Sequence, residues 1–287
     1  MQLVEKGGKK LNPAAVRRRA FVIAALLALV AGGLFMTLLN AGEKLIYFPQ
    51  PLTPAAGQAV LARHPQVHEV TLRVSDGTSL HGWHRPAGAG SARPLVLYFG
   101  GNAEEVSWML EFGAVFAGWG LGLVNYRGYG LSGGHPTERA LLADAVAIYD
   151  HFIGQPNVDP ARVVIIGRSL GSGVASYLAS QRPASGVLLI TPFDSITEVA
   201  QDFYPFLPVR LILGNLYDSA ALAPKLTMPL RMIVAGRDEV IAARHSERLF
   251  TLWAGPKEQV TIASAGHNDL QGHREYWQAI QEFLQRR

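Results

Sequence analysis

Ser169 is the residue that points most directly to chemistry, because it lies at the centre of Gly167-Arg168-Ser169-Leu170-Gly171. The apolar run Val163–Ile166 precedes this motif, and the helical stretch Ser172–Gln181 follows it. A Gly-x-Ser-x-Gly motif between a strand and a helix predicts a nucleophile elbow, a sharp turn that lifts the serine hydroxyl above the sheet. Side chains at the two glycine positions would clash across that turn. A chance match in a chain with 30 glycines is the alternative, and the flanking strand and helix argue against it.

A serine hydroxyl becomes a good nucleophile only when a base removes its proton and an acid orients that base. His267 is the expected base, because the small-residue loop 264–269 that carries it follows the last predicted strand. Asp238 is the expected acid, directly after the predicted strand 230–235. The serine–acid–histidine chain order is the one found with this type of elbow.

Other residues compete for these two roles. Glu239 follows the expected acid directly, and Asp194 and Asp218 are weaker competitors. The main alternative for Asp218 is a helix cap or a turn residue. Among the remaining histidines, His81 and His84 fall in a predicted strand and His245 and His273 in helical stretches, so we interpret these four as structural or solvent-facing.

The oxyanion formed from an attacked carbonyl needs fixed N–H donors. The backbone N–H of Leu170 is one candidate, because it opens the helix after the elbow, where the helix dipole also favours negative charge. The second is expected from the loop after the predicted strand 95–99, where Asn102 follows Gly100 and Gly101. Asn102 as the N-cap of the next helix is the alternative, and both can hold because the oxyanion donor would be a backbone group.

These candidates lie where predicted strands end. The eight predicted strands alternate with turns and helical stretches, and the short apolar runs predict an α/β fold whose mostly parallel sheet has helices on both faces. Such sheets bind ligands beyond the carboxyl ends of their strands, so one crevice can collect all the candidate groups. The predicted strands are Val67–Val74, Leu80–Pro86, Leu95–Phe99, Leu121–Tyr126, Val163–Ile166, Gly186–Ile190, Leu230–Ala235 and Gln259–Ala263.

Composition excludes several functions. The chain has no cysteine, which rules out disulfides, cysteine-ligated metals and a cysteine nucleophile. Its net charge of +4 comes from residues 1–20, which carry six basic residues and one acidic residue (6 − 1 = +5), so the remainder is 4 − 5 = −1. A nearly neutral domain lacks the basic surface that binds nucleic acid.

The N-terminal region has the pattern of a membrane anchor. Phe21–Leu39 contains no charged residue, and as a helix it would span roughly 28 Å, about one hydrocarbon core. Arg17-Arg18-Arg19 comes almost directly before it, so the positive-inside rule predicts a cytoplasmic N-terminus and an extracytoplasmic domain, periplasmic in a bacterium. A cleaved signal peptide and a buried core helix are the alternatives. The expected organisation is a basic tail (1–20), a signal-anchor helix (21–40), a linker (41–66) and a catalytic domain (67–287).

The chain resembles the α/β-hydrolase family, and within it the membrane-anchored serine hydrolases similar to the ABHD-type depalmitoylases and their bacterial relatives. The resemblance covers residues 42–287, and its most specific part is the stretch Asn125–Gly133. The family usually has histidine where Gly100 stands here, so some hydrogen bonding in the oxyanion loop must be lost or replaced. The other matching residues are Leu45–Pro49, Gly100-Gly101-Asn102, Gly167–Gly171, Thr191–Ser195, Asp238-Glu239-Val240 and Gly266–Asp269.

The resemblance and the candidate residues together predict a monomeric serine hydrolase that cleaves esters or thioesters through an acyl-enzyme, without metal or organic cofactor. A serine peptidase and a catalytically silent binding protein are the alternatives. We interpret Arg127 as scaffold that could brace neighbouring carboxylates or carbonyls. Between the predicted strands 186–190 and 230–235 lie aromatic residues that are most often packing but could line an acyl pocket. They are Phe193, Phe203, Tyr204 and Phe206.

Overall fold

The computed structural model describes residues 46–88 and 92–287, together with single helical positions between Phe21 and Gly33. The chain divides into two units, Met1–Gly42 and Glu43–Arg287. The predicted basic tail and most of the predicted anchor 21–40 lie outside the described residues, so both remain predictions. Among the residues that are described, no helix has the length and apolar character needed to cross a membrane.

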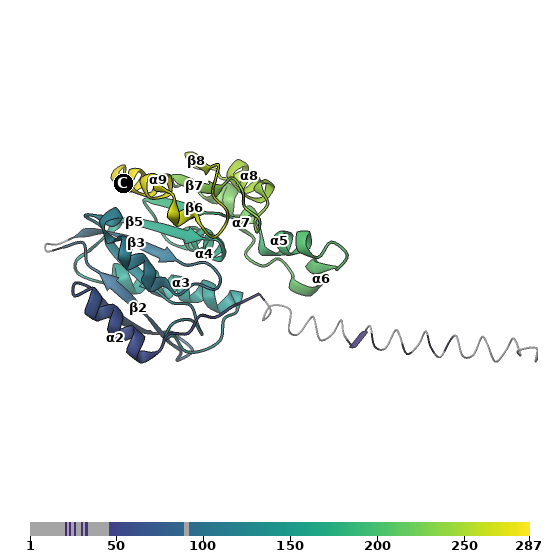
Figure 1. Cartoon of the computed structure of the whole chain (residues 1–287), viewed down its shortest axis with the longest axis horizontal. Helices are drawn as coiled ribbons and strands as arrows, with labels where there is room; N and C mark the ends of the chain where they lie inside the picture. The colour runs from purple at the N-terminus through teal and green to yellow at the C-terminus, as the bar shows by residue number, and fades with distance from the viewer. Residues whose placement is uncertain are drawn as a thin grey trace, which may run out of the picture. The chain divides into compact units, whose positions relative to one another are not determined.

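The second unit is built on one eight-stranded sheet with the order β1-β2-β4-β3-β5-β6-β7-β8 (Figure 1). β2 pairs antiparallel with both β1 and β4, and every other neighbouring pair is parallel. The predicted mostly parallel sheet is therefore confirmed, and β1 and β2 form an antiparallel pair. The strands are β1 (His68–Arg73), β2 (Ser79–Arg85), β3 (Arg93–Phe99), β4 (Gly120–Val124), β5 (Val158–Arg168), β6 (Gly186–Ile190), β7 (Leu230–Ala235) and β8 (Lys257–Ile262).

Helices cover both faces of this sheet, as predicted. Successive strand residues point to opposite faces, so Leu95, Leu97 and Phe99 join one buried cluster with α3, α4 and α8, whereas Val96 and Tyr98 join a second with α2, η2 and α9. β4 and β6 carry no charged residue, as expected of strands covered on both faces. The helices are α2 (Pro54–Arg63), η2 (Val106–Phe116), α3 (Glu138–Ile153), α4 (Leu170–Gln181), α5 (Ile196–Phe203), α6 (Val209–Leu213), α7 (Ser219–Leu222), η3 (Ala223–Lys225), α8 (Ala243–Leu252), η4 (Leu270–Gly272) and α9 (Arg274–Gln285).

The region expected as a linker, residues 41–66, contains a helix. Thr53 caps α2 by accepting a hydrogen bond from the N–H of Ala56, and proline follows at the first helical position. Val60 is buried in the second cluster, and Gly57 lies against Leu131. Residues 54–63 therefore belong to the domain.

The helix after β3 does not begin directly after Asn102, the N-cap alternative that the sequence offered. Ala103 has a φ of +57°, a left-handed conformation that no regular helix continues through. Glu105 then caps the 3₁₀ helix η2 by accepting from the N–H of Ser107. The loop before η2 is therefore longer than expected, and it lies beside the site described next.

Candidate active site

Ser169 occupies the predicted elbow between the end of β5 and the start of α4. Its φ of +49° is unusual for a residue with a side chain, and its N–H donates to the carbonyl of Ile190 at 2.9 Å. The turn leaves no room at the two motif glycines, because a Cβ on Gly167 would lie 2.2 Å from the Gly171 oxygen and one on Gly171 would lie 2.1 Å from the Phe99 oxygen. The predicted clash is therefore present at both positions.

Ser169, His267 and Asp238 meet at the carboxyl edge of the sheet, in loops that follow β5, β8 and β7. The Oγ of Ser169 lies 3.0 Å from Nε2 of His267. The Nδ1 of the same imidazole lies 2.9 Å from Oδ2 of Asp238 and 3.0 Å from Oδ1. These are hydrogen-bonding distances, so the arrangement can pass a proton from the hydroxyl to the imidazole while the carboxylate holds the ring.

Asp238 is fixed by its own turn as well as by the imidazole. Its Oδ1 accepts from the backbone N–H of Val240 at 2.9 Å and of Ile241 at 2.7 Å. Burial disfavours the carboxylate, but hydrogen bonds from His267 and from these two N–H groups outweigh burial and hold the pKa of Asp238 below its usual value. The carboxylate is therefore ionised and oriented before substrate binds.

The competing acids have other partners. Glu239 contacts the backbone of His267, whose N–H lies 3.3 Å from Oε2, and not its ring. Asp194 bonds to His245 instead, at 2.8 Å. Asp218 caps α7 by accepting from Ala221, as its alternative interpretation predicted.

His245 is buried between two carboxylates. Its Nδ1 lies 2.8 Å from Asp194 and its Nε2 lies 2.7 Å from Asp202. Both ring nitrogens are thus occupied, and the group ties α8 to α5 and to the loop after β6. The interpretation of His245 as structural agrees with this geometry.

The expected oxyanion donors lie in the predicted loops. The N–H of Leu170 is in the first turn of α4, where backbone N–H groups have no acceptor within the helix. Gly101, in the loop after β3, is close enough to the elbow that a Cβ there would lie 3.6 Å from Cβ of Ser169. Asn102 follows in the same loop, so a carbonyl oxygen above the serine hydroxyl could lie between the two segments.

The side chain of Asn102 has a role that the sequence did not reveal. Its Oδ1 accepts from the N–H of Phe48 at 3.0 Å and from the hydroxyl of Tyr129 at 2.8 Å, and its Nδ2 donates to the carbonyl of Ile46. The N-cap of the following helix is Glu105 instead. Asn102 therefore fastens the start of the described domain to the carboxyl edge of the sheet.

Glu104 is a buried residue of the site that the sequence analysis missed. Its Oε1 accepts from the hydroxyl of Tyr98 at 2.6 Å and from the indole of Trp108 at 2.8 Å. Its Oε2 accepts from the N–H of Gly101 at 2.7 Å and from Arg168 at 2.8 Å. One carboxylate thus connects the loop after β3 to the elbow.

Glu104 also explains why a glycine fits at position 100. A Cβ on Gly100 would lie 2.9 Å from Val106 and 3.2 Å from the carboxyl group of Glu104. The carbonyl of Gly100 accepts from the hydroxyl of Tyr126 at 2.9 Å. In this chain the loop is therefore held by hydrogen bonds with Glu104 and Tyr126.

The four aromatic residues proposed for substrate binding do not form one group. Phe193 is fully buried in the core, which corrects its expected place on a pocket wall. Phe203, Tyr204 and Phe206 are exposed at the end of α5 and in the loop to α6. Arg127, expected as scaffold, forms a paired contact with Asp144 at 2.6 and 2.8 Å.

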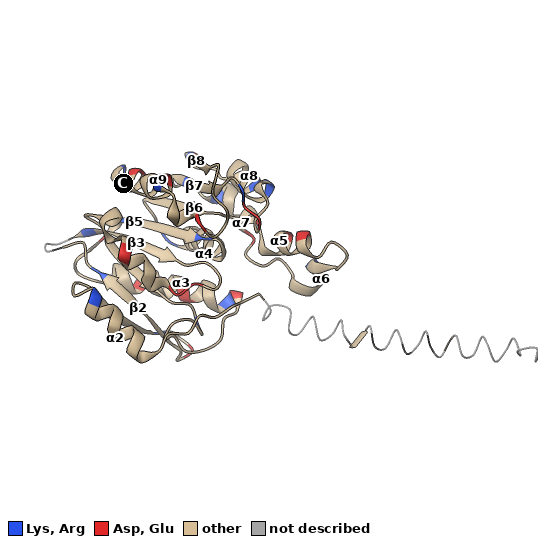
Figure 2. Cartoon of the chain, viewed as in Figure 1, with Lys and Arg blue, Asp and Glu red and all other residues tan. Residues whose placement is uncertain are grey.

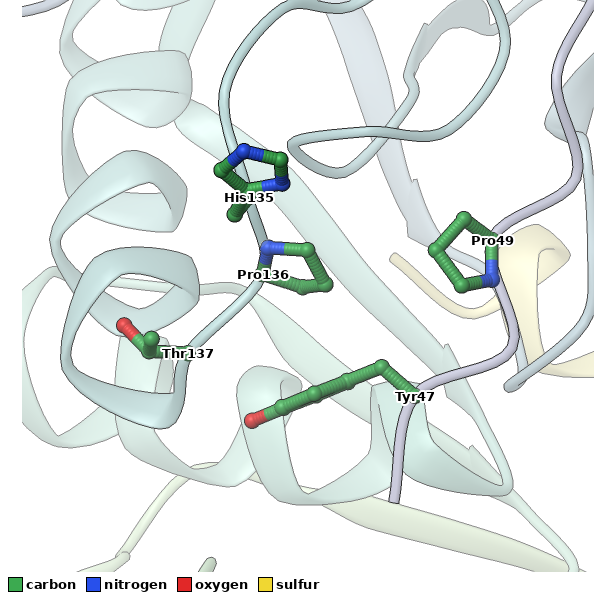
Figure 3. A pocket seen from close by; sticks show the side chains of 5 residues that line it. All are labelled: Tyr47, Pro49, His135, Pro136 and Thr137. Atoms are coloured by element: carbon green, nitrogen blue, oxygen red, sulfur yellow. The ribbon is translucent and has the colours of Figure 1, made fainter. Parts of the chain in front are cut away.

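A cavity of about 400 Å³ lies beside the loop that follows β4 (Figure 3). Tyr47, Pro49, His135, Pro136 and Thr137 line it. The hydroxyl of Tyr47 bonds to that of Tyr217 at 2.9 Å. Among the described residues, no cluster of three or more histidine or acidic side chains could hold a metal ion.

Comparison with known proteins gives a consistent family. A family model described as serine aminopeptidase, S33, matches residues 90–219. Uncharacterized protein Rv2307c of Mycobacterium tuberculosis is 39% identical over 272 residues, covering 93% of this chain and 96% of its own length. Alpha/beta hydrolase domain-containing protein WAV2 of Arabidopsis thaliana is 27% identical over 275 residues, covering 85% and 87% of the two chains.

The fold is also shared with solved enzymes. The Pyrococcus furiosus esterase Pf2001 superposes with a TM-score of 0.64 at 17% identity, over 83% of this chain and 98% of its own. At that identity the likeness establishes the fold alone.

Proposed function

Because the chain belongs to the α/β-hydrolase family, we propose that it is a serine hydrolase that cleaves carboxylic ester or thioester bonds through an acyl-enzyme. The observation that carries the proposal is the continuous hydrogen-bonded line from the hydroxyl of Ser169 through His267 to Asp238, with separations of 3.0 and 2.9 Å. A serine without such a base and orienting acid would be a poor nucleophile.

The proposed reaction proceeds in two halves. Ser169 Oγ attacks the acyl carbonyl as its proton passes to Nε2 of His267, and Asp238 stabilises the resulting imidazolium. The backbone N–H groups of Leu170 and Asn102 hold the oxyanion. The imidazolium then gives its proton to the departing alcohol or thiol, and water repeats the sequence to release the acid. No metal or organic cofactor takes part.

The proposed setting is the surface of a membrane. Phe21–Leu39 would anchor a monomer, with the N-terminus in the cytoplasm and the catalytic domain outside it, in the periplasm of a bacterium. The supporting pattern is the uncharged stretch next to Arg17-Arg18-Arg19. The proposed substrate is an acyl ester or thioester.

Peptide cleavage is the second candidate, because the matching family model is described as a serine aminopeptidase. The same triad can hydrolyse amides, so substrate preference decides between the two. A catalytically silent binding domain is the non-enzymatic alternative.

A fluorophosphonate probe and a substrate panel test the proposal. Ser169 should be the residue labelled, and Ser169→Ala should abolish labelling while leaving the folded protein intact. The wild type should hydrolyse acyl esters and thioesters with a much higher kcat/KM than unmodified peptides. Efficient peptide cleavage would establish the second candidate. A folded wild type that neither labels nor turns over would indicate the silent domain.

A further inference from the structure

The end of α5 and the start of α6 present large apolar side chains to solvent. Phe206 is 98% exposed, and the others of this group are exposed by 43–69%. We call this group the apolar tip, and it comprises Phe203, Tyr204, Phe206, Leu207 and Leu211. Single exposed apolar residues are ordinary, but a contiguous group marks an interaction surface.

The backbone of the apolar tip is ordered by hydrogen bonds. The side-chain amide of Gln201 donates to the carbonyls of Tyr204 and Leu207, each at 3.1 Å. The N–H of Leu207 also donates to Tyr204, and that of Val209 to Leu207. In Figure 1, α5 and α6 project from the body of the domain. Hydrogen bonds thus order the loop that carries the apolar side chains, which reduces the conformational entropy lost when a partner covers them.

The apolar tip contains no charged side chain, and the charged side chains near it are paired with one another. The loop 204–208 between α5 and α6 has no charged residue (Figure 2). Arg210 pairs with Glu198 at 3.0 Å, and Asp202 bonds to His245 at 2.7 Å and to Arg244. An apolar end with balanced charges behind it suits insertion into the boundary between lipid headgroups and acyl chains.

The path of the chain points to the lipid bilayer as the partner. Asn102, in the loop after β3, holds Ile46 and Phe48 at the carboxyl edge of the sheet. α5 follows the carboxyl end of β6, a parallel neighbour of β5, so the apolar tip belongs to the same edge. The six residues 40–45 can span at most ~20 Å. A bilayer that held Phe21–Leu39 would therefore lie within reach of this edge.

We propose that the apolar tip inserts into the surface of the bilayer that anchors the N-terminal segment. Insertion would turn the carboxyl edge of the sheet, where Ser169 lies, toward acylated substrates held in the membrane. The choice of this bilayer rests on the proposed anchor, and the benefit for catalysis rests on the proposed acyl hydrolysis.

The absence of cysteine permits a direct test on the full chain. Phe206→Cys would be labelled with an environment-sensitive fluorophore. The control is Ala161→Cys, labelled in the same way, because Ala161 is exposed and lies in the amino-terminal part of β5. In phosphatidylcholine vesicles, the probe at 206 should shift to shorter wavelength and be quenched by spin-labelled lipid, and the probe at 161 should do neither. High salt should not reverse the effect, because the contact is apolar.

Two results would overturn the proposal. Equal, water-like emission at both positions would show that the tip stays in solution. A shift at 206 without lipid quenching would show that protein, such as a second copy of the chain, covers it.

Activity gives an independent readout. Leu211→Asp should lower kcat/KM by roughly tenfold for a long-chain ester dissolved in the vesicles and by less than about twofold for a water-soluble short-chain ester. The matched control is Ala161→Asp, which should change neither. Equal losses on both esters would place Leu211 in catalysis or folding instead. If lipid quenches the probe at position 206 while the fluorophosphonate fails to label Ser169, the membrane-docking proposal stands and the serine hydrolase proposal is wrong.

Discussion

The carboxylate of Asp238 orients the imidazole of His267 and also accepts two backbone N–H groups of its own turn. The neighbouring Glu239 reaches only the backbone of His267. Of these two adjacent acids, Asp238 contacts the ring of His267 and Glu239 contacts its backbone, so Asp238 is the one placed to orient the imidazole.

Asp238→Asn should lower kcat by a factor on the order of 10⁴, the size found when a triad aspartate is lost in a serine protease. Glu239→Gln should cost far less, since the amide still offers an oxygen to the N–H of His267. Steady-state kinetics on one ester, with circular dichroism to verify folding, measures both. A reversed order would move the acid role to Glu239.

Glu104 allows a second prediction at this scale. Glu104→Gln keeps the shape of the side chain but removes its charge beside Arg168. The change should weaken the hydrogen bonds that position 104 accepts from Arg168 in the elbow and from the N–H of Gly101. Loss of a single oxyanion donor typically costs 10²–10³ in kcat, and partial misplacement should cost roughly tenfold. KM should change little. A variant with raised KM and unchanged kcat would show that Glu104 shapes binding and does not position the oxyanion loop.

Ser169, His267 and Asp238 were predictable because each follows a strand in a motif with few alternatives. Glu104 was not, because the contacts that define it come from Tyr98, Arg168 and other residues brought together only by the folded sheet. Neighbouring Glu105 caps η2, and nothing in the sequence distinguishes the two glutamates.

Among the elements, the strands were predicted best because buried parallel strands are continuous apolar runs. α2 was missed because its sequence, Pro54–Arg63, is short and weakly amphipathic, and its boundary depends on the cap at Thr53. The start of η2 was misplaced because the conformation of Ala103 is imposed by the loop, and alanine is ordinarily a good helix former.

The His245 cluster makes the attachment of α8 to α5 depend on pH. Hydrogen bonding to Asp194 raises the pKa of His245. At Asp194 and Asp202, burial favours the protonated acid, but the contacts with His245 prevail and lower both pKa values. Stability from the histidine is complete below its ordinary pKa of about 6.5 and is lost as the pH rises through the raised value. Stability from the acids is present above about pH 4 and is lost as the pH falls through their lowered values.

His245→Gln should therefore lower Tm more at about pH 5.5 than at about pH 8.5. Thermal unfolding followed by circular dichroism at the two pH values measures the difference. His135→Gln, at an exposed position, is the control and should give the same small change at both. A His245→Gln deficit that stays constant or grows toward high pH would show that packing alone accounts for the role of His245.

For the whole molecule, the prediction concerns topology. A protease added outside intact cells or spheroplasts should digest the domain after residue 40 and spare the N-terminal tail, because Arg17–Arg19 are expected to remain in the cytoplasm. Immunoblots against tags at the two termini measure this. Protection of the domain would reverse the orientation, and a mature N-terminus near Glu43 would establish a cleaved signal peptide.

The attachment of Ile46 and Phe48 to Asn102 also determines how the domain responds to mechanical load. Tension along the N-terminal segment reaches those contacts first, then the pair of 2.8 Å bonds that join Gly130 to Gln50 and Leu52, and only later the sheet. A pull would thus disturb the loop of Asn102 while the core is still intact. Single-molecule stretching from the N-terminus should detect this release as a small extension before global unfolding.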